Sequence, residues 1–468
     1  MQHYQFDGKK LKTLRKKKAL YQKDLAIKLN EALDNVNDEV VARHIRRWEN
    51  EGVEPRAEAI HALARILKCK TDDFFRSDSD KSESNDSQDR TKYFVEHRRY
   101  FDDIIEDRCK EFTGRGFVFD AIDKFIESND CGYFFVLGDP GIGKSAIASQ
   151  LVKQRDYIHH FNVRAKGITK SETFLRNICA QLIVRYDLPF DNLPANADSD
   201  GDFLSTLLVE SVKQLSGKGK VVILVDALDE AEKNAKANIL FLPPRLPKGV
   251  FFVITARPQS YSLRIECPQG DFRIEHNKQA NLNDIEQYLR TRSTSPGICA
   301  YAKTHELDID DFVVMMKDKS DGNFMYLIYV LPEIEAGAYK GLDCKEIPKG
   351  LENYYEDHWR RMGMMDILWP NIKFKVIYIL CEVVEPVSRE LIADFASDNE
   401  VAVQQVLDEW VPFMHKHQLE KELRFSMYHE SFRDFLRRKD IVQAAGISIE
   451  GINCMIADNL FCELFGDE

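Results

Sequence analysis

The sequence predicts a multidomain chain whose centre is an α/β domain, a parallel sheet covered by helices, with all-helical regions around it. Between Tyr93 and Ala280, short apolar runs alternate with stretches of helical period. The apolar runs are continuous rather than alternating, which is typical of parallel strands buried on both faces. The length of 468 residues corresponds to three or four domains, at about 100–200 residues for each domain.

Local patterns then predict the individual elements. An amphipathic helix is expected at 171–186, and another begins at Ser145 after a glycine-rich loop. Beyond Asn281 the pattern is helical until a short strand-like run, RFSMYH, at 424–429. The strands of the central sheet are predicted at 133–137, 157–163, 221–225 and 249–255.

Composition excludes several classes of protein. No apolar run approaches the ~18–20 residues of a membrane-spanning helix, and the polar N-terminus is unlike a signal peptide. The 10 cysteines are scattered singly, without a CxxC pair or a cluster at metal-ligand spacing, which suits reduced thiols. We therefore expect a cytoplasmic protein that makes no membrane contact.

Charge is distributed unevenly along the chain. The net charge is -12, yet residues 1–76 contain 17 Lys and Arg against 12 Asp and Glu. This N-terminal region is therefore the candidate for binding a polyanion such as DNA. Residues 77–89 contain no apolar side chain and many Ser and Asp, so a flexible linker is predicted at 77–91.

The stretch GDPGIGKS, residues 138–145, fits the phosphate-binding pattern GxxxxGK[ST]. In such a loop the glycines let backbone N–H groups surround the phosphates, Lys144 neutralises the β and γ oxygens, and the Ser145 hydroxyl binds Mg²⁺. The motif follows a predicted strand and opens a predicted helix, as this chemistry requires. An ordinary glycine-rich turn is the alternative. The predicted nucleotide-binding residues here are Gly138, Asp139, Pro140, Gly141, Ile142, Gly143, Lys144, Ser145 and Ala146.

Carboxylates and an arginine follow the last two predicted strands of the central sheet. Asp226 ends the strand at 221–225, where it can hold Mg²⁺, and Asp229 and Glu230 follow closely enough to position or activate a water molecule. Arg257 falls at the carboxyl edge of the sheet, where open α/β sheets bind ligands, and we interpret it as a γ-phosphate sensor. A solvated acidic loop and a surface arginine are the alternatives. With Lys144, these four residues form the predicted catalytic set.

Seven segments, in order, resemble the NACHT class of STAND ATPases: FTGR (112–115), GDPGIGKS, LVDALDEA, LPPRLPKGVFFVITARP, NDIEQYL, DGNFMYL and YHESFRDFL. The resemblance spans residues 95–440. It implies a slow P-loop ATPase with a nucleotide-binding domain at 92–280, a helical domain at 281–346 and a winged-helix domain at 347–440, folded over one nucleotide. Such proteins rest with ADP, and exchange it for ATP and oligomerise once a ligand is sensed.

The same resemblance implies three further nucleotide contacts. Arg115 falls where the family places an arginine near the adenine, although Gly116 replaces the usual acidic residue. Asn323 occupies a helical-domain motif that usually ends in proline. His429 matches a winged-helix histidine that reaches the β-phosphate of ADP, and a purely structural hydrogen-bonding role is the alternative.

Residues 9–76 resemble a helix-turn-helix domain of the Xre type, so we assign residues 1–76 to it. The segment VVARHIRRWENEGVEP matches the recognition helix and the turn after it. Between Ala26 and Glu49 the chain is longer than the compact turn of the family, and the insertion is acidic, so a protein-binding helical bundle is the alternative. The resemblance implies that Gln22 caps the second helix near a phosphate and that the groove is faced by Arg43, His44, Arg46 and Arg47.

These features predict a signal-transducing ATPase that switches between an ADP-bound closed monomer and an ATP-bound homo-oligomer. Its cofactors would be ATP or ADP with Mg²⁺, its N-terminal domain the output, and its setting bacterial antiviral defence or stress signalling. An ATP-controlled DNA-binding transcriptional regulator is the second interpretation. A nucleotide-independent scaffold is the third, which Lys144 and Asp226 disfavour. No repeat-type sensor for the unknown trigger ligand fits in the C-terminal helical segment, 441–468, so the sensor is minimal or lies in a longer chain.

Overall fold

The computed structural model of the chain divides into two compact units: residues 1–100 with 189–193, and the remainder. The predicted linker and most of the acidic insertion lie outside the residues that the structure describes. None of the described helices is both long enough and apolar enough to cross a bilayer. The described residues are 5–76 and 100–465, apart from 7, 19, 21, 33–41, 51, 52, 54, 70, 191, 192, 195, 216–218, 234–236, 259–262, 340–345, 384, 420 and 421.

The first unit is a small helical bundle. Its two ends meet in an antiparallel pair in which Phe6 lies opposite Phe75. Apolar side chains that recur at helical spacing fill the core, among them Leu11, Leu25, Leu29, Ile45, Leu63 and Phe74. The elements are β1 (Gln5–Phe6), α1 (Gly8–Lys17), α2 (Gln22–Ala32), α3 (Ala42–Asn50), α4 (Ala57–Leu67), η1 (Thr71–Phe74) and β2 (Phe75–Arg76).

A buried ion pair joins three helices of this bundle. Arg15 Nε donates to Glu49 Oε1 at 2.5 Å, and Arg15 Nη2 donates to Oε2 at 3.0 Å. Gln22 Nε2 donates to the same Oε2 at 2.8 Å. Glu49 is 3% exposed, so its charge has been removed from water and is compensated by these two partners.

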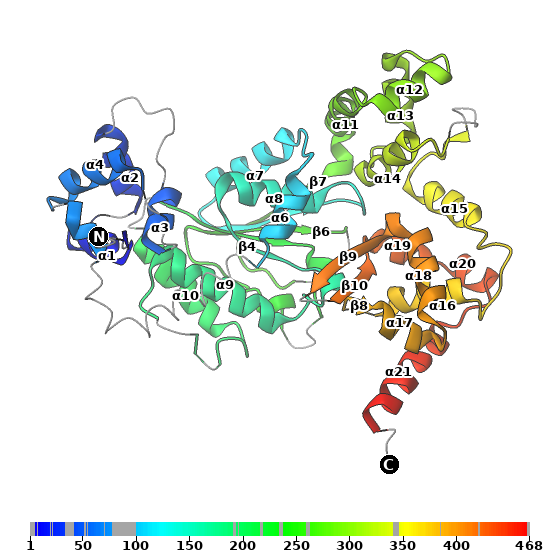
Figure 1. Ribbon diagram of the computed structural model, residues 1–468. Helices are drawn as coiled ribbons and strands as arrows, with labels where there is room; N and C mark the ends of the chain where they lie inside the picture. The colour runs from blue at the N-terminus through cyan, green and yellow to red at the C-terminus, as the bar shows by residue number, and fades with distance from the viewer. Residues whose placement is uncertain are drawn as a thin grey trace. The chain divides into compact units, whose positions relative to one another are not determined.

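The second unit contains the predicted parallel sheet, with five strands in the order β4-β5-β6-β3-β7 (Figure 1). Every residue of β3 to β6 is buried, which explains why these four strands were predicted from continuous apolar runs. The edge strand β7 was not predicted, because its residues are polar and exposed or half-buried. The strands are β3 (Gly132–Leu137), β4 (Ile158–Phe161), β5 (Val221–Asp226), β6 (Val250–Ala256) and β7 (Gln269–Arg273).

Helices cover both faces of this sheet. On one face α6 (Asp102–Cys109), α7 (Gly116–Ser128) and α8 (Lys144–Arg155) share a hydrophobic cluster with inward side chains of the strands, and α6 packs along α8. On the other face, α9 (Ser171–Tyr186) and α10 (Asp202–Gln214) pack against β4 and β5 (Figure 1). The predicted helix at 171–186 coincides with α9.

The remainder of the second unit is mostly helical. The predicted boundary at 281 falls inside a helix, since α11 begins at Lys278, and the three domains predicted between 92 and 440 lie in one compact unit. Its first helices are α11 (Lys278–Arg292), α12 (Pro296–Thr304), α13 (Ile309–Lys319) and α14 (Phe324–Glu335). The next helices are α15 (Leu351–Arg361), α16 (Ile372–Glu382), α17 (Arg389–Ala396) and α18 (Glu400–Glu409).

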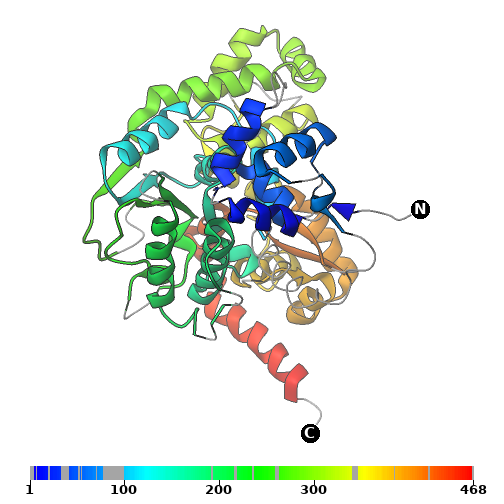
Figure 2. The ribbon, with the colours of Figure 1, turned by 90° about the vertical axis from the view of Figure 1, so that its left-hand side faces the viewer.

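A three-stranded antiparallel sheet and three helices complete the chain. The predicted strand at 424–429 is β10 (Glu422–Met427), which lies between β8 (Val387–Ser388) and β9 (Met414–Leu419). A helical pattern was expected up to residue 424, but α18 ends at Glu409 and pairing with β10 makes Met414–Leu419 a strand. The last helices are α19 (Glu430–Leu436), α20 (Lys439–Ala444) and α21 (Ile449–Phe465), and α21 extends away from the rest of the unit in both views (Figures 1 and 2).

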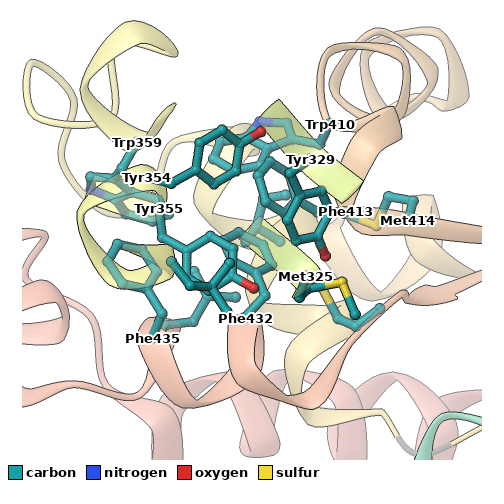
Figure 3. Close-up of a cluster of buried hydrophobic side chains, with 14 of the residues drawn as sticks. Met325, Tyr329, Tyr354, Tyr355, Trp359, Trp410, Phe413, Met414, Phe432 and Phe435 are labelled. Carbon is teal, nitrogen blue, oxygen red and sulfur yellow. The ribbon is translucent and has the colours of Figure 1, made fainter. Parts of the chain in front are cut away.

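A cluster of aromatic side chains holds α19 against α14 and α15 (Figure 3). The ring of Phe413 lies 4.3 Å from that of Phe432 on α19 and 5.2 Å from that of Tyr329 on α14, between ring centroids. Tyr355 on α15 lies 5.2 Å from Phe432, and its hydroxyl bonds that of Ser431 at 2.8 Å. Buried aromatic side chains contribute about 2–3 kcal/mol each, so this cluster fixes the position of α19 and of the residues that precede it.

The ion pair in the first unit gives a testable prediction. Replacing Glu49 with alanine leaves the buried guanidinium of Arg15 without its carboxylate, which costs about 3–5 kcal/mol. The amides of α1 to α4 should therefore lose that much protection in hydrogen exchange. Lys28→Ala, at an exposed position of α2, is the control and should change protection by less than about 0.5 kcal/mol. Unchanged exchange in Glu49→Ala would contradict the assignment.

Candidate functional site

A pocket of about 340 Å³ lies at the carboxyl edge of the parallel sheet in the second unit. Its walls come from the loop between β3 and α8, the segment after β5, the end of α6, the start of α14, and residues 428–430 before α19. Segments far apart in the sequence therefore meet at one place. The volume falls in the range of about 300–1,000 Å³ that small-molecule sites occupy.

The loop that carries the phosphate-binding motif forms one wall. Lys144 Nζ donates to the carbonyl oxygens of Gly138 at 2.6 Å and Asp139 at 3.0 Å. Burial lowers the pKa of Lys144, while the carboxylates of Asp229 and Asp226 act in the opposite direction. This ammonium group is therefore a half-buried cation aimed along the loop, where phosphate oxygens would provide its compensating charge.

The glycines of the loop are structurally required at two positions. Gly141 has a φ of +82° and Gly143 a φ of +99°, values that side chains with a Cβ rarely adopt. A Cβ at Gly141 would also lie 2.6 Å from Asn323 Oδ1. The loop thus has the backbone conformation and the close packing expected of a phosphate cradle.

The start of α14 contacts this loop through its backbone. Asn323 caps α14 by accepting from the Tyr326 N–H at 3.3 Å, and its Nδ2 donates to the Pro140 carbonyl at 2.9 Å. The Met325 N–H donates to the Gly141 carbonyl at 3.0 Å. Asn323 was predicted to contact the nucleotide, but the structure places it against the loop and not among the residues that line the pocket.

Arg115 links the loop to two helices. Its Nη2 donates to the Ile142 carbonyl at 2.5 Å, its Nη1 donates to Asn281 Oδ1 at 2.6 Å, and its guanidinium lies 4.6 Å from the ring centroid of Phe324. The residue is 2% exposed, and burial lowers its pKa to about 10. Arg115 lines the pocket as predicted, and its hydrogen bonds also hold α11 and α14 on the loop.

The residues present fit a nucleotide with Mg²⁺. Asp226 is buried at the end of β5 and accepts a hydrogen bond from Thr255 Oγ1 at 2.5 Å. Burial raises the pKa of Asp226, and the hydroxyls of Thr255 and Ser145 counteract that effect. Ser145 and Asp226 would hold Mg²⁺, which neutralises phosphate charge. Within the described part of the chain no group of three His, Cys, Asp or Glu residues could hold a metal, so phosphate oxygens would complete the coordination.

Glu230 is a half-buried carboxyl beside three other carboxylates. Its Oε2 accepts from the backbone N–H of Arg164 at 2.8 Å. Burial is the main cause that raises its pKa to about 7, and the charges of Glu430, Asp229 and Asp226 add to it. Near neutral pH this group is therefore divided between its acid and its ionised form.

Two ion pairs connect the edge of the sheet to α19. Arg257 follows β6 and pairs with Asp229 of the core, Nε to Oδ2 at 3.1 Å, and with Asp434 of α19, Nη1 to Oδ2 at 2.6 Å. Arg164 Nη1 lies 2.6 Å from Glu430 Oε1. Arg257, which was predicted as a phosphate sensor, is thus held by one carboxylate of the core and one carboxylate of α19.

His429 stands at the start of α19 and lines the pocket. Its Nδ1 accepts from the Ser431 N–H at 3.1 Å, so the neutral ring carries its proton on Nε2. Burial lowers the pKa of His429 to about 3, with further lowering by Arg108, Lys144 and Arg257. His429 therefore caps the helix, which is the structural role that the sequence left open, and its contact with a β-phosphate stays a prediction.

Several pocket residues were not predicted, because no local motif marks them. Arg164 and Asp434 do not line the pocket themselves, but the packing of η2 (Arg164–Lys166) and α19 pairs them with Glu430 and Arg257, which do. The acidic spacing in HESFRDFL places Glu430 and Asp434 on one face of a helix, and that was the available signal. The unpredicted lining residues include Asp107, Arg108, Glu111, Tyr288, Phe324, Ile328, Tyr428 and Glu430.

The residues predicted to contact DNA belong to the first unit. Arg46 is 6% exposed, which does not fit the prediction that its side chain faces a groove. Gln22 begins α2 as expected, but its side-chain amide is bonded to Glu49. His44 and Arg47 are half-buried on α3, and Arg43 begins that helix with a side chain outside the described residues.

A comparison with protein families matches the part of the chain that carries the phosphate-binding loop. Residues 122–249, which include the phosphate-binding loop and Asp226, match the family described as "Nephrocystin 3, N-terminal". The second unit has an α/β P-loop core. No curated protein sequence matches the chain.

Two solved structures show limited similarity. One is a Signal Transduction ATPase with Numerous Domains (STAND) protein with a tetratricopeptide repeat sensor from Pyrococcus horikoshii, 16% identical with a TM-score of 0.38 over 71% of this chain. The chain spans 44% of the length of that protein. The other is a RuvB variant from Thermotoga maritima, 10% identical with a TM-score of 0.25, which covers 69% of this chain and 95% of its own.

The carboxyl of Glu230 predicts a stability that depends on pH. Its pKa is about 7 in the folded protein, compared with an ordinary value of 4.5. The protonated carboxyl therefore contributes fully to the free energy of unfolding below pH 4.5, and this contribution is lost as the pH rises through about 7. Glu230→Gln cannot ionise. Its thermal midpoint should exceed that of the wild type by about 2–4 °C or more at about pH 8, and by less at about pH 6.

The control for this experiment is Glu172→Gln, which changes an exposed carboxylate of α9. It should leave the midpoint unchanged at both pH values. A Glu230→Gln effect of equal size at both pH values would show that Glu230 does not retain its proton in the fold.

Proposed function

We propose that this chain is a signal-transducing ATPase in which the bound nucleotide determines whether α19 stays docked on the P-loop core. The observation that carries the proposal is the double connection of α19 to the sheet edge, Arg164 with Glu430 and Arg257 with Asp434. The core and α19 both line the pocket, so a nucleotide there makes different contacts in the docked and undocked forms. A ligand shifts two conformations only through such a difference in affinity.

The docked form is poorly arranged for hydrolysis. Arg257 is paired with Asp229 and Asp434, and Glu230 retains much of its proton because it is buried near Glu430. Undocking of α19 would remove Glu430 and Asp434, lower the pKa of Glu230 and make Arg257 available to a γ-phosphate. Glu230 and Asp229 could then orient water, and Arg257 could stabilise developing charge.

The proposal assigns ADP to the docked monomer and ATP to an undocked form that assembles with further copies of the chain. Residues 1–76 would be the output module, with a DNA or protein partner. Assembly would raise the effective concentration of weak contacts made by this module. The sequence resemblance to STAND ATPases and the polar interface around the pocket support this assignment.

Lys144→Ala tests the nucleotide site itself. The substitution removes the ammonium group of the loop, and hydrogen bonds to charged groups contribute about 1.5–3 kcal/mol each. The dissociation constants of ADP and ATP, measured by calorimetry, should therefore rise by about 100-fold. Lys213→Ala, at an exposed position of α10, should bind as the wild type does. A dissociation constant of Lys144→Ala within about twofold of the wild type would refute the site.

The double variant Glu430→Gln and Asp434→Asn tests the docking of α19. Both substitutions keep the shape of the side chains and remove the charges that pair with Arg164 and Arg257. Each partly exposed pair contributes about 1 kcal/mol, so the equilibrium should shift towards the undocked form by about 10-fold or more. We expect more assembly in light scattering and faster ATP hydrolysis.

The control for the docking experiment is Glu422→Gln, which removes a carboxylate paired with Arg424 on the same strand. It should leave assembly and hydrolysis unchanged. Assembly and hydrolysis at wild-type levels in the double variant would contradict a switch based on α19.

A further inference from the structure

The pocket contains more negative than available positive charge. Asp226, Asp229, Glu230 and Glu430 all lie in or beside it. A nucleoside di- or triphosphate would add further negative charge, which requires cations near the phosphates. Lys144 supplies one, but a single ammonium group does not balance both the phosphate tail and the surrounding carboxylates.

Two of the three arginines that line the pocket already have other partners. Arg115 uses its guanidinium to hold Asn281 and the Ile142 carbonyl. Arg257 is paired with Asp229 and Asp434. Among the pocket-lining side chains in the described part of the chain, Arg108 is the guanidinium that makes no hydrogen bond or ion pair.

The position of Arg108 directs it to the phosphate end of the pocket. It lies in the last turn of α6, which packs along α8, the helix that begins in the phosphate-binding loop. Among the charges acting on His429 its effect is the largest, and at Asp226 it exceeds that of Lys144. Arg108 is therefore close to the residues on both sides of the expected phosphate position.

The neighbour of Arg108 on α6 does not neutralise it. Asp107 also lines the pocket, but its Oδ1 accepts from Lys110 Nζ at 3.0 Å. The guanidinium of Arg108 is half-buried, which strengthens its interaction with an anion compared with a fully solvated charge. A planar guanidinium can also bond two phosphate oxygens at once.

We infer that Arg108 binds the phosphate tail of the nucleotide, as a second cation opposite Lys144 that the phosphate-binding motif does not include. This inference rests on the proposed nucleotide binding and adds a phosphate ligand from α6. Because the same side chain lies near His429, it would contact the nucleotide at the boundary between the core and α19.

Arg108→Met tests the inference, because methionine keeps the apolar stem and removes the charge. The dissociation constants of ADP and of a non-hydrolysable ATP analogue should rise by about 10-fold or more relative to the wild type. The nucleotide-free thermal midpoint should remain that of the wild type. Arg176→Met, at a position of α9 that is more than half exposed, removes the same charge outside the pocket and should bind nucleotide normally.

Two results would overturn the inference. One is a dissociation constant of Arg108→Met within about twofold of the wild type for both nucleotides. The other is weaker binding accompanied by a lower midpoint of the nucleotide-free protein, which would mean that Arg108 acts by holding α6 in place. A wild-type chain that binds neither nucleotide would instead refute the proposed function, so the two failures are distinguishable.

Discussion

Helix α19 is attached to the P-loop core by polar contacts, while it is attached to α14 and α15 by buried aromatic side chains. The cluster around Phe413 and Phe432 belongs to a hydrophobic core that runs from α11 to α21, separate from the hydrophobic cluster on the α6–α8 face of the parallel sheet. Between these two clusters lie ion pairs such as Arg257 with Asp434 and hydrogen bonds such as Asn323 with Pro140. Residues from both sides of this polar seam line the pocket.

The contacts in this polar seam are weaker than those in the aromatic cluster. A partly exposed ion pair contributes about 1 kcal/mol, whereas each buried aromatic side chain contributes about 2–3 kcal/mol. Separation of the unit is therefore easier along the polar seam than through the aromatic cluster. The pocket lies on the seam, so a ligand with several charges can compete with the contacts that close it. A switch requires such a balance between comparable small energies.

Electrostatics gives the pocket its chemical character. Burial raises the pKa of Glu230 to about 7, and the charges of the neighbouring carboxylates add to that effect. Lys144 and Arg108 face these groups from two helices that pack together, α8 and α6. In the first unit the same principle has a structural role, because Glu49 holds Arg15 and Gln22 inside the bundle. Buried charge there stabilises a small core rather than a ligand site.

The sequence by itself determined the parts of this protein that depend on local pattern. Continuous apolar runs predicted β3 to β6, and the loop at 138–145 predicted the phosphate cradle, since glycine and lysine spacing reflects backbone geometry within a few residues. Tertiary structure decided what depends on long-range packing. Arg108 lines the pocket without belonging to a motif, because α6 folds over the sheet edge, and the packing of η2 and α19 brings Arg164 and Asp434 into ion pairs with Glu430 and Arg257. The burial of Arg46 was not predicted, because a helical period alone does not reveal which face of a helix its neighbours cover.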